Sequence, residues 1–363
     1  MVDQKWIHEG MFEGPVVRAA LAIMLSFLIV LFCGGRVIRW LMKMKLGDLP
    51  EFHNKELNEL SKNKKNTPTM GGIMIIGSIL ITSLLMADLT VFYVKAALFC
   101  MVYLAGLGMV DDWLKLRLAW RPSGSRDGLL AWEKMVFQIG LGVLLAVFIY
   151  YHWRHDGAPS YQLNWPFVRS MTLPIWVFCV LTVLVIAGSS NAVNLTDGMD
   201  GLAAGCMAIV AFAFLALAHT TGSVGWAARL GFTWINQASE LAIVCGAITG
   251  ACLGFLWYNC NPAQVFMGDT GSLALGGTIG YIAIVIRQEP MLLLVGGIFV
   301  VEAMSVMMQV TYFRMTKGKR IFLCSPIHHH FHLKGWSEQQ VVVRFWLISA
   351  LCAAFGIATV KLR

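Results

Sequence analysis

The chain has 363 residues, of which 58% are hydrophobic and only 13% are charged, and its formal net charge is +8. Soluble domains are about half apolar and a quarter charged, so this composition excludes an ordinary soluble protein and indicates a polytopic membrane protein. Basic loops on one membrane face explain the positive charge, and nucleic acid is not an expected partner. The nine cysteines are scattered without a CxxC pair, which argues against disulfide staples and zinc ribbons.

Ten apolar runs are long enough to cross a bilayer, which takes about 17–25 residues per helix. Backbone groups cannot stay unpaired in lipid, so each run is expected to be a helix, and the first is expected to be retained rather than cleaved. The fold class is therefore all-α, with about ten transmembrane helices. In chain order the runs are 19–35, 70–87, 89–110, 135–153, 170–188, 202–218, 241–258, 270–286, 290–312 and 345–360.

Lysine and arginine concentrate in the loops after the first, third and ninth runs. Basic loops stay in the cytoplasm, so both termini are expected on the outer, periplasmic side. Residues 1–363 then form a single integral-membrane domain with no soluble part. The loops predicted to be cytoplasmic are about 41–69, 111–134, 188–201, 259–269 and 313–344.

The unusual polar motifs all fall at these five places. Because the topology came from basic residues alone, this segregation indicates one polar site facing the cytoplasm. The motifs are KKNTPTMGG (64–72), VDDWLK (110–115), NAVNLTDGMDG (191–201), NCNPAQVFMGDTG (259–271) and SPIHHHFH (325–332).

Five aspartates stand at the membrane boundary on this face: Asp111, Asp112, Asp197, Asp200 and Asp269. A single one of them could simply cap a helix. Five together, two of them adjacent, repel one another unless a cation lies between them. Oxygen-rich sets of this kind suit Mg²⁺, which commonly takes one or two carboxylates together with substrate phosphate oxygens.

Basic side chains share this face: Lys64, Lys115, Lys134 and the histidines 328–330. Most lysines there set the topology, but acids among bases also fit a metal–phosphate site. The histidine run is internal, so it is not a terminal tag. Zinc is disfavoured, because three consecutive residues on a helix cannot all reach one ion.

Two function classes remain at this point: an enzyme acting on a phosphorylated or nucleotide substrate at the membrane surface, and a transporter of an anion or divalent metal. Transporters place polar groups near the membrane midplane and often contain repeats. Here the polar groups crowd one end of the helices, which favours the enzyme. Glu302, in the middle of the ninth run, is expected to point into the bundle.

The motifs TPTMGG, VDDWLK, NLTDGMDGLA, NPAQVFMGDTGSLALGG and PIHHHFHLKGW resemble the bacterial phospho-N-acetylmuramoyl-pentapeptide transferases, a branch of the polyprenyl-phosphate N-acetylhexosamine-1-phosphate transferases. The resemblance runs from about residue 53 to the last run, with the motifs in the family's order. The PIHHHF stretch separates this branch from the N-acetylglucosamine branch, which is the main alternative. Asn66 and Asn261 depart from the family pattern.

The resemblance implies transfer of phospho-MurNAc-pentapeptide from UDP-MurNAc-pentapeptide to undecaprenyl phosphate, giving lipid I and UMP. It also implies Mg²⁺ as cofactor, a homodimer, and a place in the bacterial inner membrane with the active site facing the cytoplasm. Direct attack and a covalent aspartyl-phosphate route both stay open.

The resemblance further implies roles for individual residues. Asp269 would hold Mg²⁺, Asp111 would deprotonate the lipid phosphate, Asp112 would support it, and His328 joins them as a catalytic residue. The remaining matched positions would bind substrate: Lys64, Thr69, Lys115, Lys134, Asn194, Asp197, Asp200, Asn259, Phe266, Gln309, His329 and His330.

Overall fold

The computed structural model describes residues 14–44, 67–118, 128–155, 161–163 and 171–360, and they are almost entirely helical. A short antiparallel hairpin joins β1 (Gln162–Leu163) to β2 (Met171–Thr172). The helices are α2 (Pro15–Lys43), α4 (Gly72–Met86), α5 (Phe92–Leu118), α6 (Ala131–His155), α7 (Ile175–Thr196), α8 (Leu202–Gly222), α9 (Val224–Leu230), η2 (Ala238–Glu240), α10 (Leu241–Asn259), α11 (Gly268–Val285), α12 (Glu289–Val295), α13 (Gly297–Met315), α14 (Ile327–Leu333) and α15 (Glu338–Thr359).

Each predicted apolar run overlaps a helix, although the fifth run (170–188) also includes β2, and the result confirms a helical membrane protein. Eight helices in the described part are long and apolar enough to span a bilayer. The other two, α4 and α11, are 15 and 18 residues long. All of α11 from Asp269 to Val285 is buried, so this glycine-rich helix faces other helices and does not need a lipophilic surface. A total of ten crossings stays a prediction.

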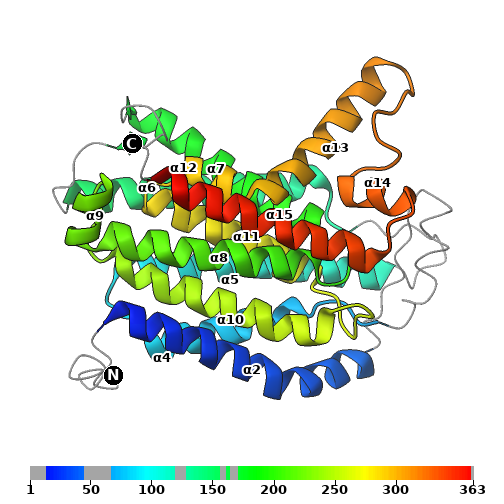
Figure 1. Cartoon of the computed structure of the whole chain (residues 1–363), viewed down its shortest axis with the longest axis horizontal. Helices are drawn as coiled ribbons and strands as arrows, with labels where there is room; N and C mark the ends of the chain where they lie inside the picture. Colours follow the sequence, from blue (N-terminus) through cyan, green and yellow to red (C-terminus); the bar gives the residue numbers. More distant parts are fainter. Residues whose placement is uncertain (1–13, 45–66, 119–127, 156–160, 164–170, 361–363) are drawn as a thin grey trace.

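The ninth run differs from its prediction as one helix. It is broken at Gly296 into α12 and α13. Gly–Ser or glycine pairs are a common cause of sharp helix kinks, and Gly296 is followed directly by Gly297. A Cβ at Gly297 would lie 2.8 Å from the Cys352 sulfur on α15, so a larger residue would be crowded there. Beyond the break, α13 leaves the bundle obliquely and rises beside α14 (Figure 1).

Helix ends also extend past the predicted loop boundaries. Asp111 and Asp112 lie within α5 rather than in a loop, and Lys134 lies in the first turn of α6. Residues 188–196, predicted as loop, form the last turns of α7. Hydrophobicity marks only the part of a helix that contacts lipid, and the hydrogen-bonded backbone continues into the polar region.

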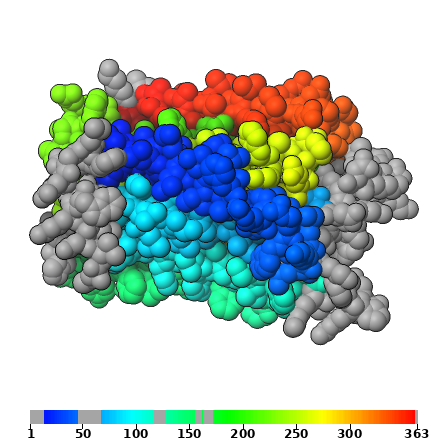
Figure 2. All heavy atoms as spheres, turned by 90° about the horizontal axis from the view of Figure 1, so that it is seen from below, coloured from blue at the N-terminus to red at the C-terminus, as the bar shows by residue number. Residues whose placement is uncertain are grey.

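Small residues set the packing at the centre. Helix α10 lies between α2 and α8, and α11 packs against α5 and α7. A Cβ at Gly250 would lie 2.0 Å from the Ile23 carbonyl oxygen, so α2 and α10 touch through their backbones. Figure 2 shows α2 lying across one face of the bundle with α10 beside it.

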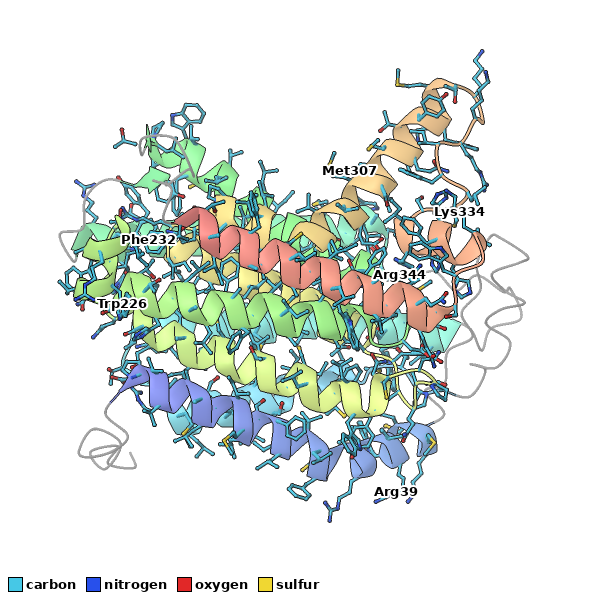
Figure 3. The ribbon with its side chains drawn as sticks, in the orientation of Figure 1. Arg39, Trp226, Phe232, Met307, Lys334 and Arg344 are labelled. Carbon is cyan, nitrogen blue, oxygen red and sulfur yellow. The ribbon has the colours of Figure 1, made fainter. Side chains whose placement is uncertain are left out.

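Helix α2 begins and α15 ends at the same end of the bundle (Figure 1). At that end the Arg18 guanidinium donates to the Glu240 carboxylate and to the Met86 carbonyl, tying α2 to η2 and α4. Figure 3 places Trp226 and Phe232 at this end, and Lys334 and Arg344 at the opposite end. Which end faces the cytoplasm stays a prediction.

Replacing Gly72 with alanine is expected to destabilise the protein, because the new Cβ would lie 2.2 Å from the Gly271 backbone nitrogen on α11. Such overpacking costs about 1–3 kcal/mol of unfolding free energy, measurable as a lower thermal midpoint in detergent. Gly77→Ala in the same helix is the matched control, since nothing lies within 4 Å of its Cβ. Equal midpoints for the two variants would contradict this packing.

Candidate functional site

Three carboxylates meet where α5 ends and α11 begins. One oxygen from each of Asp111, Asp112 and Asp269 lies within 4.8 Å of the others, and all three residues are buried. Asp111 and Asp269 are separated by more than 150 positions in the chain, so only the packing of α5 against α11 brings them together. The sequence prediction that these aspartates share one site is supported by this geometry.

A glycine allows this contact. Gly108 lies one turn before Asp112 on α5, and a Cβ there would lie 2.2 Å from the Asp269 carbonyl oxygen. The two helix backbones therefore touch at the level of the acids. Any side chain at position 108 would push α11, and with it Asp269, away from Asp111.

Asp112 caps the N-terminus of α11 from a different helix. Its Oδ1 accepts from the Asp269 backbone nitrogen at 3.1 Å, and its Oδ2 accepts from the Thr270 nitrogen at 3.0 Å and the Thr270 hydroxyl at 2.7 Å. The first N–H groups of a helix lack partners within it, and the helix dipole favours a negative charge there. Asp112 thus fixes the position of Asp269.

Two lysine ammonium groups lie between the other two acids. Lys134 Nζ is 2.8 Å from Asp111 Oδ2 and 2.7 Å from Asp269 Oδ2. Lys115 Nζ is 2.7 Å from Asp111 Oδ2 and 3.2 Å from Asp269 Oδ2. The backbone nitrogen of Leu129 donates to Asp111 Oδ1 at 2.7 Å. The two lysine ammonium groups therefore offset the negative charges of Asp111 and Asp269.

A row of polar side chains continues from Asp269 into the bundle. Asn194 donates to Asp269 Oδ1 at 2.8 Å and to the Ser272 hydroxyl at 2.9 Å. One turn earlier on α7, Asn191 donates to Gln138 Oε1 at 2.7 Å. Sequence reasoning missed Gln138, which is fully buried. Its position four residues after Lys134, on the same face of α6, is the feature of the sequence that could have indicated it as a site residue.

The TPTMGG and NPAQVFMGDTG stretches are joined through their backbones. The nitrogens of Gly71 and Gly72 donate to the carbonyls of Phe266 and Met267, and the Phe266 nitrogen donates to the Pro68 carbonyl. This pairing places Thr69 against Gly268, whose built Cβ would lie 3.0 Å from the Thr69 hydroxyl. Phe266 remains partly exposed at this edge of the acidic cluster.

Two of the predicted substrate residues brace the loops. Asn259 Oδ1 accepts from the Gly201 nitrogen, and its Nδ2 donates to the Val265 carbonyl. Asp200 Oδ2 accepts from Asn261 Nδ2 and from the Ala263 nitrogen, both at 3.1 Å. Asn261, a departure from the family pattern, thus has a local role, and substrate contacts by Asn259 and Asp200 stay a prediction.

Asp197 follows α7 directly, in the turn that contains Gly198. Burial raises the pKa of the Asp197 carboxyl well above its usual range, and repulsion from Asp269 and Asp112 adds to this effect. A raised pKa favours the protonated carboxyl, which can donate a hydrogen bond to an anionic oxygen.

The three consecutive histidines of α14 have different surroundings. His328 Nδ1 lies 3.0 Å from Glu302 Oε2, and both side chains are buried. His330 Nδ1 accepts from the Leu323 nitrogen, and burial together with Lys334 lowers its pKa. His329 is buried beside the His328 ring. Among the described residues, the group able to hold a metal is the aspartate cluster and includes no histidine.

Gln309 binds the loop before α14 rather than the acidic cluster. Its Oε1 accepts from the nitrogens of Ile321 and Phe322, and its Nε2 donates to the Phe322 carbonyl. Its predicted contact with substrate stays a prediction. Lys64 lies outside the described residues. The structure brings six of the predicted site residues into direct contact: Asp111, Asp112, Lys115, Lys134, Asn194 and Asp269.

The donor set fits a hard divalent cation. Carboxylate oxygens of Asp111 and Asp269 point toward the same small volume. The ammonium groups of Lys115 and Lys134 contact these oxygens and offset their charge. Mg²⁺ takes one or two carboxylates plus phosphate oxygens. Asp112 is less available, because each of its oxygens already accepts from the α11 terminus.

These features define a class: an intramembrane helical bundle with an acidic, lysine-lined centre at one end, suited to a phosphate-bearing substrate. Comparison with known proteins agrees. Residues 94–287 match the pattern of glycosyl transferase family 4, and residues 64–76 match signature 1 of the phospho-N-acetylmuramoyl-pentapeptide-transferases.

Relatives match over nearly the whole chain. A phospho-N-acetylmuramoyl-pentapeptide-transferase of Desulfotalea psychrophila is 45% identical over 360 residues, which cover 98% of this chain and 96% of the relative. Proteins of the same name from Rickettsia rickettsii and Rickettsia felis are each 40% identical over 355 residues, with the same coverage. The chain therefore belongs to the phospho-N-acetylmuramoyl-pentapeptide-transferase family.

Replacing Asp112 with asparagine should lower the unfolding free energy. The Asp269 and Thr270 nitrogens donate to different oxygens of the carboxylate, so asparagine would turn its NH₂ group toward one of them and leave that buried N–H without an acceptor. A buried unsatisfied group costs about 1–3 kcal/mol, seen as a lower thermal midpoint in detergent. Asp88→Asn is the matched control, because Asp88 Oδ1 accepts from Thr90 and an amide oxygen can do the same. Unchanged stability of the Asp112 variant would reject the capping role.

Proposed function

We propose that the chain transfers phospho-MurNAc-pentapeptide from UDP-MurNAc-pentapeptide to undecaprenyl phosphate, giving lipid I and UMP. The observation that carries this proposal is the near-complete match to relatives of that name, together with the meeting of Asp111, Asp112 and Asp269 at one point. An oxygen of the lipid phosphate bonds to the β-phosphorus of the donor, the bond from that phosphorus to the bridging oxygen breaks, and UMP leaves.

Mg²⁺ would be held by Asp269, with Asp111 near enough to assist, and would neutralise charge on the donor diphosphate. The lysines supply the rest of the charge balance. In the structure each ammonium contacts both acids. An arriving diphosphate gives Lys115 and Lys134 stronger, doubly charged partners, so both would move from carboxylate to phosphate oxygens. Positioning and charge neutralisation are the main requirements of phosphoryl transfer.

Asp111 would take the proton from the lipid phosphate once the lysines turn to the diphosphate. Its burial also supports direct attack over an aspartyl-phosphate intermediate. Asp111 is fully buried, and its oxygens accept from Leu129, Lys115 and Lys134. A carboxylate acting as nucleophile would have to bring its oxygen to bonding distance of the β-phosphorus from this buried position, whereas a base needs only one free lone pair directed at the proton.

The remaining residues would bind the donor around this centre. Asn194 and Asp197 lie on or next to the end of α7, and Phe266 is partly exposed where its ring could stack on uracil. Thr69, Asp200, Asn259, Gln309, His329 and His330 would shape the pocket walls. Lys334 and Arg344 lie at this end of the bundle, in keeping with a cytoplasmic site in the bacterial inner membrane (Figure 3). A homodimer is part of the proposal.

Asp269→Asn should lower UMP release by at least about 100-fold, because the site loses a charge that positions the diphosphate. The assay uses detergent-purified protein with undecaprenyl phosphate and UDP-MurNAc-pentapeptide, with and without Mg²⁺. Wild-type release should require the metal. Asp88→Asn, which changes a carboxylate remote from the site, should keep normal turnover. Full activity of Asp269→Asn with an intact thermal midpoint would remove Asp269 from its metal role.

The donor decides between branches of the superfamily. UDP-MurNAc-pentapeptide should be turned over at least about 100-fold more efficiently than UDP-GlcNAc, since a site built to bind a polar group discriminates strongly against its absence. Comparable kcat/KM values for the two donors would favour the N-acetylglucosamine branch. Movement of labelled anion across sealed vesicles without UMP formation would instead indicate a transporter.

A further inference from the structure

A buried acid–histidine pair links the obliquely placed α13 to α14. Glu302 is near the start of α13, and His328 is the second residue of α14. Glu302 Oε2 lies 3.0 Å from His328 Nδ1, and neither side chain is exposed at all. The only role suggested for Glu302 by the sequence is that it points into the bundle. The structure gives it a specific partner.

The pair is incompletely satisfied by the protein itself. Among the described residues, Glu302 Oε1 and His328 Nε2 are buried without a hydrogen-bond partner. An unpartnered buried polar atom costs about 1–3 kcal/mol, and ionisable groups inside a membrane protein usually mark functional sites. A pair kept only for stability would be expected to satisfy both ends.

The orientation of the ring is set by the acid. A carboxylate only accepts hydrogen bonds, so the short contact puts the ring hydrogen on Nδ1 and leaves Nε2 on the opposite side. Nε2 lies against Gly198, where a built Cβ would come within 2.4 Å of it. Gly198 directly follows Asp197, in the turn that leaves α7 beyond Asn194. Nε2 therefore faces the turn that borders the acidic cluster.

A neutral side chain already connects α13 to the loop before α14. Gln309, seven residues after Glu302 on α13, binds the backbone of Ile321 and Phe322 through its neutral amide. Glutamine at position 302 could likewise accept from Nδ1–H. A carboxylate at this buried position adds negative charge beside the His328 ring. A neutral amide would make the same hydrogen bond, so the charge itself requires a functional explanation.

We propose that Glu302 is a positioning residue that acts through His328. It fixes the ring with Nδ1–H toward α13 and Nε2 toward the Gly198 turn, and its charge stabilises the ring when Nε2 carries a proton beside the bound diphosphate. In Ser-His-Asp triads an acid likewise orients a histidine and stabilises its cationic form. The inference rests on the proposed function, because the diphosphate is the partner that Nε2 would meet.

The test compares Glu302→Gln with Glu289→Gln. Glu289 is also a buried carboxylate, but it accepts from the Tyr161 hydroxyl at the end of the bundle away from the acidic cluster. Glu302→Gln keeps shape and acceptor and removes the charge. We expect it to lower kcat for UMP release about 10- to 100-fold while the thermal midpoint and the KM for undecaprenyl phosphate stay unchanged. Glu289→Gln should leave kcat unchanged.

A double-mutant cycle tests whether Glu302 works through the histidine. In a His328→Ala background, Glu302→Gln should cause no further loss, since its only route of action is gone. Nitrogen-15 NMR of histidine-labelled wild type should show the hydrogen of the neutral His328 ring on Nδ1. This measurement does not depend on turnover.

Normal kcat for Glu302→Gln, multiplying losses in the cycle, or a hydrogen on Nε2 in the neutral ring would each overturn the inference. Failure of the proposed function gives a different result. In that case the wild-type protein itself would release no UMP from UDP-MurNAc-pentapeptide with Mg²⁺ present.

Discussion

The contact between the N-terminus of α11 and the Asp112 carboxylate is the interaction on which the site depends. A buried helix that begins inside a bundle exposes N–H groups which need acceptors, and Asp112 supplies both of its oxygens to them. Gly108 and Gly72 let α5 and α4 approach this terminus closely enough for the contact. Asp269, the second residue of α11, is held at a fixed place because of it, and so is its distance from Asp111.

Charge balance follows from the same arrangement. The buried acids Asp111 and Asp269 are too close to be stable alone, and the ammonium groups of Lys115 and Lys134 lie between them. In the proposed function, an anionic substrate and a divalent cation would replace these contacts together. Hydrogen bonds along the polar row from Asn194 to Gln138 continue from the cluster into the bundle. Glu302 and His328 form a second, separate hydrogen-bonded pair behind the Gly198 turn.

Helix positions could be predicted well because a bilayer demands long apolar runs, and each such run overlaps a helix. The break at Gly296 was not predicted, since Val295 and Ile298 on either side are as apolar as a continuous helix would be. Asp111 and Asp112 look equivalent in sequence, yet one contacts lysines and the other caps a helix. Asn259 and Asp200 resemble binding residues in their motifs, but their side chains bind neighbouring loops.

The sequence by itself determined the membrane class, the helical fold, the motifs and the family, because hydrophobicity and local residue order carry that information. Only the tertiary structure decided which acid faces which base, where α13 turns away, and that Glu302 meets His328. The physical reason is distance along the chain. Contacts form only after whole helices have packed, as between Asp112 and Thr270 or between Glu302 and His328. Glycines set how closely the helices approach, and the sequence around a glycine does not show which residues will lie beside it in space.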